Sequence, residues 1–498
     1  MNINYSNPVN YELKNYSEKP KIYDLGFREY DARWLYPDQI NLPGIQMIGL
    51  GLGCLIKKNK NNKQICVGHD SRSYSFEVKE SLISGLIASG IDVIDLGLTI
   101  SPAAYFAQYY LNCDNVAMVT ASHNPNGWTG IKMGNEKTLT FGPKLIGELK
   151  NIIREKNIKI DKPGTYTFKN INEEYINDII ERYSISRKIK AVVACGNGTA
   201  GIFAPKALKC IGIEVIPLHC DLDNSFPNYN PNPEDLVMLK DLSKNVLKYN
   251  ADIGFAFDGD GDRLGVVDNE GKEIFSDKVG LLIARNLARE NFKSKFVVDV
   301  KSTSLFKTDS VLKETNSEVF FWKTGHSYIK RKTFEMRALA GFERSGHFFF
   351  NQPIGRGYDD GLMSALEVLK ILDNNKNKTF SDLYDELQTT FSSPTMSPKC
   401  PDEVKYEIIE KIEKIFNNKK TNNNLIAGQR IISVLTVNGV RVELEDGSWG
   451  LVRASSNSPN LVVVCESLES KEKMKQIFSE LNCVLSDFNE IGDYDQKI

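Results

Sequence analysis

The sequence lacks any apolar run of the roughly 18 to 20 residues that a membrane-spanning helix needs. Residues 1–17 are polar and tyrosine-rich and contain no apolar core of a secretory signal. The nine cysteines include no Cys-x-x-Cys pair, which argues against a zinc site or a disulfide framework and is typical of reduced thiols. These absences predict a cytoplasmic protein with no membrane partner.

Neither sign of charge is in excess. The chain has 62 Lys and Arg residues against 64 Asp and Glu residues, a formal charge of −2. Proteins that bind nucleic acid present a basic face, so we expect no nucleic acid partner. What is present is an ordinary globular composition, 41% hydrophobic and 25% charged. At roughly 150 residues per domain, the chain is long enough for about three to four domains.

Most of the chain alternates short β-branched runs with amphipathic stretches. We predict strands at 65–67, 91–96 and 116–119, with helices at 76–88 and 103–111 between them. This βαβ order indicates a mainly parallel sheet. The same rhythm returns after residue 189 and after residue 278, which predicts three α/β units.

The C-terminal part changes character from about residue 400. We predict a helix at 404–416, a polar segment at 417–424 and a closing helix at 469–481. Asn-Gly, Asp-Gly and Ser-Pro turn signals separate four predicted strands at 432–437, 440–444, 451–454 and 461–465. This order indicates a smaller α+β domain. The predicted domains are 1–168, 169–273, 274–390 and 391–498.

The first chemical motif is Asp-Gly-Asp-Gly-Asp-Arg at 258–263, between two apolar runs. The glycines let the backbone curl, so the three carboxylates can converge around a cation. Hard oxygen ligands favour Mg²⁺ or Ca²⁺. An EF-hand loop is excluded because Arg263 and Asn269 stand where that loop requires Gly and Glu. An exposed acidic turn is the structural alternative, and we favour a divalent metal site.

The second motif is Thr-Ala-Ser-His-Asn-Pro at 120–125, directly after a predicted strand. Ligands gather at the carboxyl ends of strands in open α/β sheets, so this loop is well placed for a site. Adjacent Ser and His side chains diverge and no Gly-x-Ser-x-Gly elbow is present, which argues against a hydrolase. Taken alone, the segment is also compatible with a plain polar turn.

A third motif points to another class of protein. Gly-Asn-Gly-Thr-Ala-Gly at 196–201 follows a predicted strand, and Glu214 lies at about the distance of the acidic residue in a dinucleotide-binding fold. An NAD(P)-dependent oxidoreductase is therefore a distant alternative. Close packing of a strand against a helix explains the glycines equally well.

Together, the motifs at 120–125 and 258–263 resemble those of the α-D-phosphohexomutase superfamily, in particular its bacterial phosphomannomutase/phosphoglucomutase branch. In that family a serine is carried as phosphoserine, and three aspartates with a seryl phosphate oxygen hold Mg²⁺. The resemblance implies that Ser122 is the phosphoryl carrier and that Ser122, Asp258, Asp260 and Asp262 are the metal ligands. It also places Lys132 and Arg263 at catalytic positions. Phosphoryl transfer depends on positioning and on neutralising oxygen charge, which gives both cations a role.

Further segments resemble family signatures in the expected order, over roughly residues 20 to 466. They are Phe-Arg-Glu-Tyr-Asp-Ala-Arg at 27–33, Lys301, Lys-Thr-Gly-His-Ser at 323–327, Glu-Arg-Ser-Gly-His at 343–347 and Arg-Ala-Ser-Ser-Asn-Ser-Pro at 453–459. The resemblance adds Arg33 and His347 to the catalytic residues. The implied substrate-binding residues are Tyr30, Arg263, Lys301, His326, Glu343, Ser345, His347, Arg453, Ser455 and Asn457.

Two positions depart from the family pattern. Arg344 replaces the usual Met or Gln in the sugar-reading loop, and 457–459 reads Asn-Ser-Pro in place of Thr-Glu-Pro. Both concern the choice of sugar and leave the reaction type unchanged. For His347, a proton shuttle, a phosphate contact and a structural histidine all stay open.

The resemblance implies both a fold and a reaction. The fold class is α/β, with three similar mixed-sheet α/β domains and a C-terminal α+β domain, like the TATA-box-binding protein, around a central cleft. The reaction is reversible intramolecular phosphoryl transfer between the 1- and 6-phosphates of mannose or glucose, through a bisphosphohexose. One Mg²⁺ per chain and hexose 1,6-bisphosphate as activator are implied.

Three matters stay open at this stage. Phosphoglucosamine mutase is the nearest alternative within the family, and a non-catalytic phosphosugar-binding protein is an alternative outside it. We expect a monomer, with a homodimer as the alternative.

Overall fold

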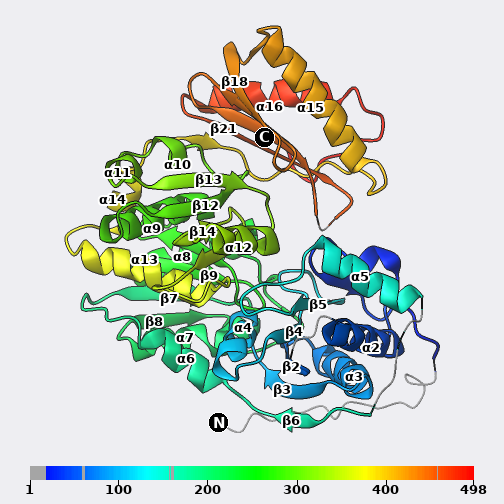
Figure 1. Ribbon diagram of the computed structural model, residues 1–498. Coiled ribbons are helices and arrows are strands. Elements are labelled where there is room, and N and C mark those ends of the chain that lie inside the picture. The colour runs from blue at the N-terminus through cyan, green and yellow to red at the C-terminus, as the bar shows by residue number, and fades with distance from the viewer. Residues whose placement is uncertain (1–17, 59–61, 156–157, 159–161, 457) are drawn as a thin grey trace. The chain divides into compact units, whose positions relative to one another are not determined.

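The computed structural model describes residues 18–58, 62–155, 158, 162–456 and 458–498 (Figure 1). The chain forms two compact units. The first comprises Met1–Ile274, Gly346–Phe348 and Pro353–Lys376, and the second comprises Phe275–Ser345, Phe349–Gln352 and Asn377–Ile498. No helix in the described part of the chain is long and apolar enough to cross a membrane.

The first sheet has the order β1-β5-β4-β2-β3-β6. Strands β4, β2, β3 and β6 are parallel, and β5 is antiparallel to both of its neighbours, β4 and β1. Its strands are β1 (Ala32–Leu35), β2 (Gln64–His69), β3 (Asp92–Leu98), β4 (Asn115–Val119), β5 (Trp128–Gly134) and β6 (Tyr166–Phe168). Its helices are η1 (Asp24–Gly26), α2 (Leu42–Lys58), α3 (Ser75–Ala88), α4 (Ser101–Tyr110) and α5 (Pro143–Arg154). The predicted βαβ elements are confirmed, with bounds shifted by one or two residues. β-branched strand residues such as Ile65 and Val67 are fully buried in one core with Leu82 of α3.

The second sheet has the order β11-β10-β9-β7-β8. Strand β7 is parallel to both of its neighbours, and β10 is antiparallel to both β9 and β11. Its strands are β7 (Lys190–Ala194), β8 (Glu214–Leu218), β9 (Ile253–Phe257), β10 (Leu264–Asp268) and β11 (Glu273–Ile274). The helices beside it are α6 (Asn172–Ile180), η2 (Thr199–Ile202), α7 (Ala204–Cys210), α8 (Leu236–Tyr249) and α13 (Gly361–Asn374). The loop that joins β9 to β10 carries the Asp-Gly-Asp-Gly-Asp-Arg motif.

The third sheet has the order β13-β12-β14-β15, and β12 is parallel to both β13 and β14. Its strands are β12 (Lys295–Asp299), β13 (Glu318–Trp322), β14 (Ala340–Phe342) and β15 (Phe348–Phe350). Its helices are α9 (Ser276–Glu290), α10 (Leu305–Thr308), α11 (Ser310–Glu314), α12 (His326–Glu335) and α14 (Phe380–Asp385). Parallel strands end at the same edge of a sheet, so the loops after β12, β13 and β14 lie together there.

The fourth sheet is antiparallel throughout, in the order β16-β21-β20-β19-β18-β17. Its strands are β16 (Phe391–Ser392), β17 (Leu425–Ile426), β18 (Gln429–Leu435), β19 (Val440–Leu444), β20 (Trp449–Ala454) and β21 (Leu461–Ser467), with helices α15 (Lys405–Thr421) and α16 (Lys471–Leu485). Alternate residues take opposite faces. Val452 and Val463 pack under both helices, and Leu451 and Val464 pack against Val300 of the third domain.

The C-terminal domain differs from the prediction in three places. The closing helix, predicted at 469–481, lies at Lys471–Leu485. The segment 417–424, predicted to be polar and non-helical, continues α15 as far as Thr421. Lys and Asn tolerate the exposed face of a helix whose buried face is supplied earlier by Ile412 and Phe416. The strand predicted at 432–437 begins and ends earlier, at Gln429–Leu435.

The architecture agrees with the predicted fold class, because three α/β domains precede a C-terminal domain built on an antiparallel sheet. The exact domain boundaries stay a prediction. Residues 353–376, which include α13, group with the first unit although they follow the third domain's strands in the chain.

Candidate active site

The loop after β4 presents the side chain of Ser122. The backbone of Ser122 has φ 53°, a left-handed conformation that non-glycine residues rarely adopt. Two hydrogen bonds hold it there: its N–H donates to Thr120 Oγ1 over 2.8 Å, and its carbonyl accepts from Arg72 Nη2 over 2.9 Å. The Ser122 hydroxyl then donates to Asp258 Oδ2 over 3.0 Å. Such local strain is typical of functional sites, where surrounding contacts maintain it.

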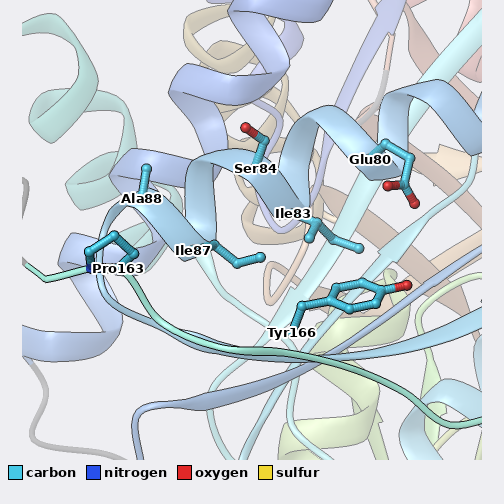
Figure 2. Close-up of a pocket in the computed structure, with 7 residues that line it drawn as sticks. All are labelled: Glu80, Ile83, Ser84, Ile87, Ala88, Pro163 and Tyr166. Carbon is cyan, nitrogen blue, oxygen red and sulfur yellow. The ribbon is translucent and has the colours of Figure 1, made fainter.

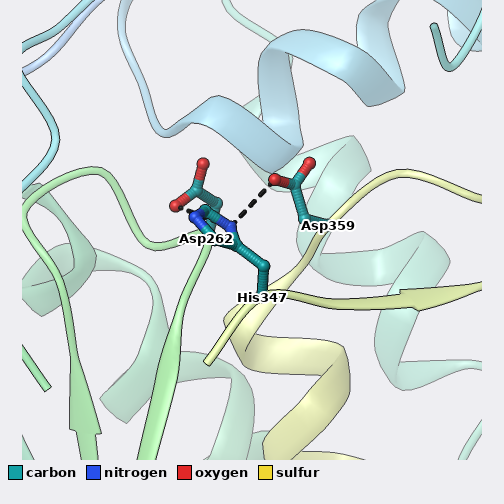
Figure 3. Close-up of side chains that lie close together, drawn as sticks. All are labelled: Asp262, His347 and Asp359. Carbon is teal, nitrogen blue, oxygen red and sulfur yellow. Dashed lines mark ion pairs between the residues drawn. The ribbon is translucent and has the colours of Figure 1, made fainter. Parts of the chain in front are cut away.

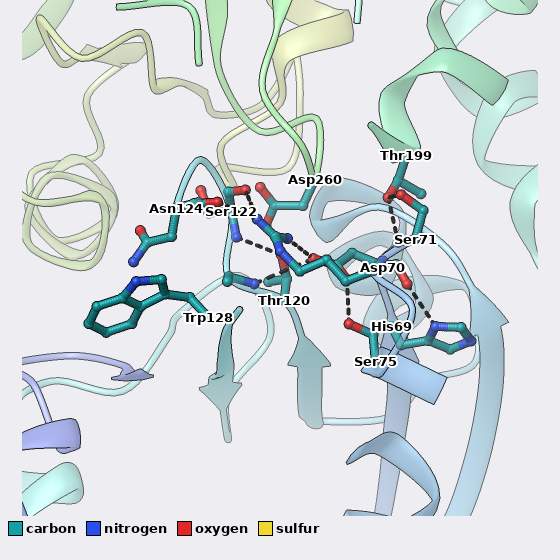
Figure 4. A network of polar contacts seen from close by, with 12 residues as sticks. His69, Asp70, Ser71, Ser75, Thr120, Ser122, Asn124, Trp128, Thr199 and Asp260 are labelled. Atoms are coloured by element: carbon teal, nitrogen blue, oxygen red, sulfur yellow. Dashed lines mark hydrogen bonds and ion pairs between the residues drawn. The ribbon is translucent and has the colours of Figure 1, made fainter. Parts of the chain in front are cut away.

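Arg72 is a supporting residue that the sequence reasoning missed. Its Nη2 also donates to the carbonyl of Asn124 over 2.7 Å, so one guanidinium holds both ends of the turn at 122–124. The Arg72 guanidinium pairs with Asp70, which also accepts from Ser75 Oγ over 2.6 Å (Figure 4). The signal was present, because 69–72 reads His-Asp-Ser-Arg at the end of β2, next to β4 in the sheet.

Asp258, Asp260 and Asp262 form a buried acidic cluster. All three side chains are fully buried, and one carboxylate oxygen from each lies within 4.8 Å of the others. The loop curls around the first carboxylate, because the N–H groups of Asp262 and Arg263 donate to Asp258 Oδ1 over 3.1 and 3.2 Å. The convergence predicted from the glycine spacing is confirmed.

Lys132 offsets part of this negative charge. Its ammonium donates to Asp260 Oδ2 over 2.7 Å and pairs with Asp262. Burial alone would lower the pKa of Lys132, but the carboxylates of Asp260 and Asp262 outweigh it and raise that pKa well above its usual value. Burial would raise the pKa of Asp260, but the positive charge of Lys132 outweighs burial and lowers the pKa of Asp260 below its usual value. Burial, followed by the Asp262 and Asp260 charges, raises the pKa of Asp258 well above its usual range.

The cluster fits a divalent cation. Within the described residues, Asp260 Oδ1 and Asp262 Oδ1 are buried and accept no hydrogen bond. A buried carboxylate oxygen without a donor is unfavourable unless a cation compensates it. Two cations lie beside the three carboxylates, Lys132 and Arg263, whose Nε is 3.7 Å from Asp258 Oδ2, so one negative charge stays unbalanced. The donor set is entirely oxygen, which is the set that hard divalent cations prefer.

His347 lies between the acidic cluster and a second carboxylate. Its Nδ1 is 3.0 Å from Asp359 Oδ2 and 3.5 Å from Asp262 Oδ1 (Figure 3). Arg263 Nε donates to His347 Nε2 over 2.8 Å. Because arginine only donates, Nε2 must accept, which assigns the imidazole proton to Nδ1, facing Asp359. Asp359 was missed by the sequence reasoning. Its signal was the Asp-Asp pair that precedes α13.

Arg33 reaches the same loop from β1. Its Nε donates to Asp31 Oδ2 over 2.8 Å, and its Nη1 donates to Asn124 Oδ1 over 2.8 Å. Burial would lower the pKa of Arg33, but Asp31 outweighs it and raises that pKa. Tyr30 is buried just before this pair. The structure therefore brings Arg33, Ser122 and Lys132 together within the first unit.

The glycine-rich turn after β7 supports the acidic cluster. A Cβ added at Gly198 would lie 2.9 Å from Gly259 Cα, and the N–H of Thr199 donates to the Gly259 carbonyl over 2.9 Å. Thr199 Oγ1 accepts from the N–H of Ser71 over 2.9 Å. The turn thus packs against the chain's own loop between β9 and β10, and the dinucleotide-binding interpretation is not supported.

The remaining predicted site residues belong to the second unit. Lys301 follows β12, His326 begins α12 after β13, and Glu343 and Ser345 follow β14; all four are buried. Arg453 lies near the end of β20, where its Nη2 donates to Ser456 Oγ over 3.2 Å. Ser455 Oγ lies 2.9 Å from Ser458 Oγ. Asn457 lies outside the described residues.

A hollow of about 690 Å³ lies elsewhere in the first domain, between α3 and the segment around β6 (Figure 2). Aliphatic side chains such as Ile83 and Ile87 line it with Tyr166, and its charged lining residue is Glu80. An acidic, largely apolar lining does not suit a phosphate ester. The buried cluster around Ser122 is therefore the candidate active site.

Models of four domain families match the chain in order. They are phosphoglucomutase/phosphomannomutase alpha/beta/alpha domain I at residues 24–159, domain II at 173–271, domain III at 275–391 and the C-terminal domain at 399–482. Each of the predicted chemical motifs therefore falls within a matched domain of this family.

Similar proteins span almost the whole chain. A phosphomannomutase/phosphoglucomutase of Pseudomonas syringae pv. tomato is 36% identical over 476 residues, which cover 95% of this chain and 98% of that protein. A phosphoglucomutase of Neisseria meningitidis serogroup A is 33% identical, covering 92% of this chain and 96% of that protein. The crystal structure of a phosphoglucomutase/phosphomannomutase family protein from Burkholderia thailandensis has a TM-score of 0.83 and 30% identity, covering 94% of this chain and 98% of that one. The chain therefore belongs to the phosphoglucomutase/phosphomannomutase family of phosphohexomutases.

Proposed function

We propose that the chain catalyses reversible transfer of a phosphoryl group between the 1 and 6 positions of mannose phosphates, glucose phosphates or both. The observation that carries the proposal is the position of the Ser122 hydroxyl, 3.0 Å from Asp258 of the buried acidic cluster, with Lys132 paired to the same cluster. The names of the similar proteins from Pseudomonas and Neisseria support the same sugars.

Ser122 carries the phosphoryl group. In the first step the bond between phosphorus and Ser122 Oγ breaks, a bond forms from phosphorus to a free hydroxyl of the hexose phosphate, and that hydroxyl loses its proton. In the second step the bisphosphohexose returns its other phosphate to Ser122 Oγ, and the freed sugar oxygen regains a proton. His347, Lys132 and Arg33 are the candidates for the group that moves the proton.

Charge balance assigns roles to the surrounding residues. Asp258, Asp260, Asp262 and a seryl phosphate oxygen would hold one Mg²⁺, which supplies positive charge for the transferring oxygens when bound. A seryl phosphate adds about −1.5 to −2 charges, so Lys132 and Arg263 are needed beside the metal. Hexose 1,6-bisphosphate acts as the activator because it can phosphorylate Ser122.

The sugar and its second phosphate are assigned to the loops of the second unit. Arg453 offers planar, paired donors for a phosphate, with Ser455 and Asn457 beside it in the chain. Glu343 and Ser345 can read sugar hydroxyls as acceptor and donor, and Lys301, His326 and Tyr30 are the other proposed substrate contacts. We place the enzyme in the cytoplasm, since all nine cysteines are free thiols, and we expect it to act as a monomer.

A coupled assay with mannose 1-phosphate and glucose 1-phosphate, hexose 1,6-bisphosphate and Mg²⁺ tests the proposal, with glucosamine 1-phosphate as a third substrate. In Ser122→Ala we expect loss of multiple turnover by about 10³-fold or more, since the variant has no phosphoryl acceptor. Intact-protein mass should show one added phosphate on the wild-type chain after incubation with the bisphosphate, and none on the variant.

The matched control is Ser84→Ala, an exposed serine on α3 of the same domain, which should keep wild-type activity. Isomerase activity close to wild type in Ser122→Ala would contradict the mechanism. Activity with none of the three sugars would contradict the proposed substrates.

A further inference from the structure

Asp299, the last residue of β12, joins three loops of the third domain. Its carboxylate is fully buried and accepts three hydrogen bonds: from Ser302 Oγ over 2.6 Å, from the Arg344 N–H over 3.2 Å and from Thr324 Oγ1 over 3.0 Å. The donors come from the loops after β12, β14 and β13. These are the loops that carry Lys301, the Glu343–Ser345 segment and His326.

The loop that carries Lys301 is also held through its carbonyl groups. Arg441 Nη1 donates to the carbonyls of Val300 and Ser302 over 2.8 and 2.6 Å, and Arg344 Nη1 donates to the carbonyl of Lys301 over 3.3 Å. Arg441 is itself fully buried, with its guanidinium 3.8 Å from the Trp449 ring. Three successive carbonyls are therefore fixed by two arginines.

Asn438 extends these contacts to Arg453, the proposed phosphate ligand near the end of β20. It lies half-buried between β18 and β19, and its Oδ1 accepts from the Thr324 N–H over 3.1 Å and from Arg453 Nε over 3.0 Å. One continuous chain of hydrogen bonds thus runs from the backbone of Arg344 through Asp299, Thr324 and Asn438 to the guanidinium of Arg453.

We propose that Asp299 and Asn438 are positioning residues that set the loops of the sugar and the second phosphate relative to one another. The inference rests on the proposed function, because it takes these loops to be the substrate contacts. A buried carboxylate whose donors are all supplied by the protein holds those donors in place before substrate arrives. Asn438 fixes the direction of the Arg453 guanidinium, on which paired recognition of a phosphate depends.

The decisive variant is Asn438→Ala, measured by calorimetric titration with glucose 1-phosphate and mannose 1-phosphate and by steady-state kinetics. Loss of the shared acceptor should raise Kd and KM for the sugar phosphates by about tenfold, the effect of one lost hydrogen bond to a charged group. The Mg²⁺ concentration for half-maximal activity should stay unchanged, since the acidic cluster belongs to the first unit. Asn438→Asp should restore affinity, because a carboxylate accepts both hydrogen bonds.

Two further variants make the test specific. Thr324→Val keeps the side-chain shape and the backbone N–H but removes the donor to Asp299, and it should raise KM in the same direction. Asn422→Ala, an exposed asparagine after α15, is the matched control and should bind as the wild type does.

The outcomes separate the two proposals. If the wild-type chain binds and isomerises the sugar phosphates while Asn438→Ala and Thr324→Val bind them equally well, the positioning role is wrong and the proposed function stands. If the wild-type chain neither binds nor isomerises them, the proposed function is wrong and the inference falls with it.

Discussion

A buried arginine needs protein acceptors for its donors, and Arg344 finds them inside its own unit. Its side chain is 4% exposed, with Nη2 donating to the Ser393 carbonyl over 2.8 Å and the guanidinium 4.8 Å from the Phe275 ring. Asp277 Oδ2 is 3.8 Å from Nη1. The residue therefore ties the loop after β14 to the segment that follows β16, and its charge is compensated by neighbours within the protein.

Arg344→Met tests this assignment at the residue scale. Methionine fills irregular space but cannot donate to the carbonyls of Ser393 and Lys301, so we expect a lower melting temperature. The ratio of kcat/KM for mannose 1-phosphate to that for glucose 1-phosphate should stay within about twofold of wild type, because the guanidinium does not read the sugar. A tenfold change in that ratio would show that Arg344 does select the sugar.

At the scale of elements, loops are held by other loops. The loop between β9 and β10 packs on the glycine turn after β7, and a Cβ at Gly259 would lie 2.7 Å from the Ser122 carbonyl. Small residues at these contacts let three backbones approach one another closely. The distance between Ser122 and the acidic cluster is thus set by backbone contacts as well as by side chains.

Gly198→Ala should disturb this packing. The added methyl group would press on Gly259 and shift the loop between β9 and β10, so we expect the Mg²⁺ concentration for half-maximal activity to rise several-fold. Stability should fall by about 1–3 kcal/mol, the usual effect of overpacking. Gly147→Ala in α5 is the control, since a Cβ there meets nothing within 4 Å, and it should be neutral or stabilising by about 0.5–1 kcal/mol. An unchanged Mg²⁺ requirement in Gly198→Ala would rule out the supporting role of the turn.

At the scale of the whole molecule, the first unit is completed by a helix from far along the chain. Tyr175 Oη donates to Asp360, and Tyr183 Oη donates to Glu367 Oε1 over 2.8 Å. These two hydrogen bonds hold α13 beside α6. Asp360 also caps α13 by accepting from the Met363 N–H over 3.0 Å. Burial raises the pKa of Asp360 to about 7.

This raised pKa predicts a pH dependence of stability. The folded chain retains the Asp360 proton up to about pH 7, whereas the unfolded chain releases it near the ordinary aspartate value of about 3.9. The folded state therefore binds more protons between these values, and the free energy of unfolding contributed by Asp360 falls as pH rises through that window.

Asp360→Asn keeps the cap and the acceptor for Tyr175 but removes the titration. We expect the melting temperature of the variant minus that of the wild type to rise from pH 4 towards pH 7 and then to level off. Calorimetry at unit intervals of pH measures this difference. Melting temperatures that change in parallel over the whole range would show that the folded chain does not hold this proton.

Much of this protein could be predicted from local patterns. The strands and helices of the βαβ units, the Asp-Gly-Asp-Gly-Asp-Arg loop and the Ser122 loop are short segments. Their conformation depends mainly on neighbouring residues in the chain. The structure confirms the predicted βαβ elements and the convergence of Asp258, Asp260 and Asp262. The end of α15 and the start of β18 were predicted wrongly, because packing against the rest of the domain decides where such elements begin and end.

What the sequence by itself determined is which chemical groups the protein carries and on which loops they lie, since motif order and periodicity are local properties. Only the tertiary structure decided which partners those groups have. Arg72 holds a turn about fifty residues away in the chain, Asp359 faces His347, and Asn438 joins Thr324 to Arg453. Such contacts follow from how strands are ordered in a sheet and how helices cover it, and the spacing of residues in one chain does not specify that order.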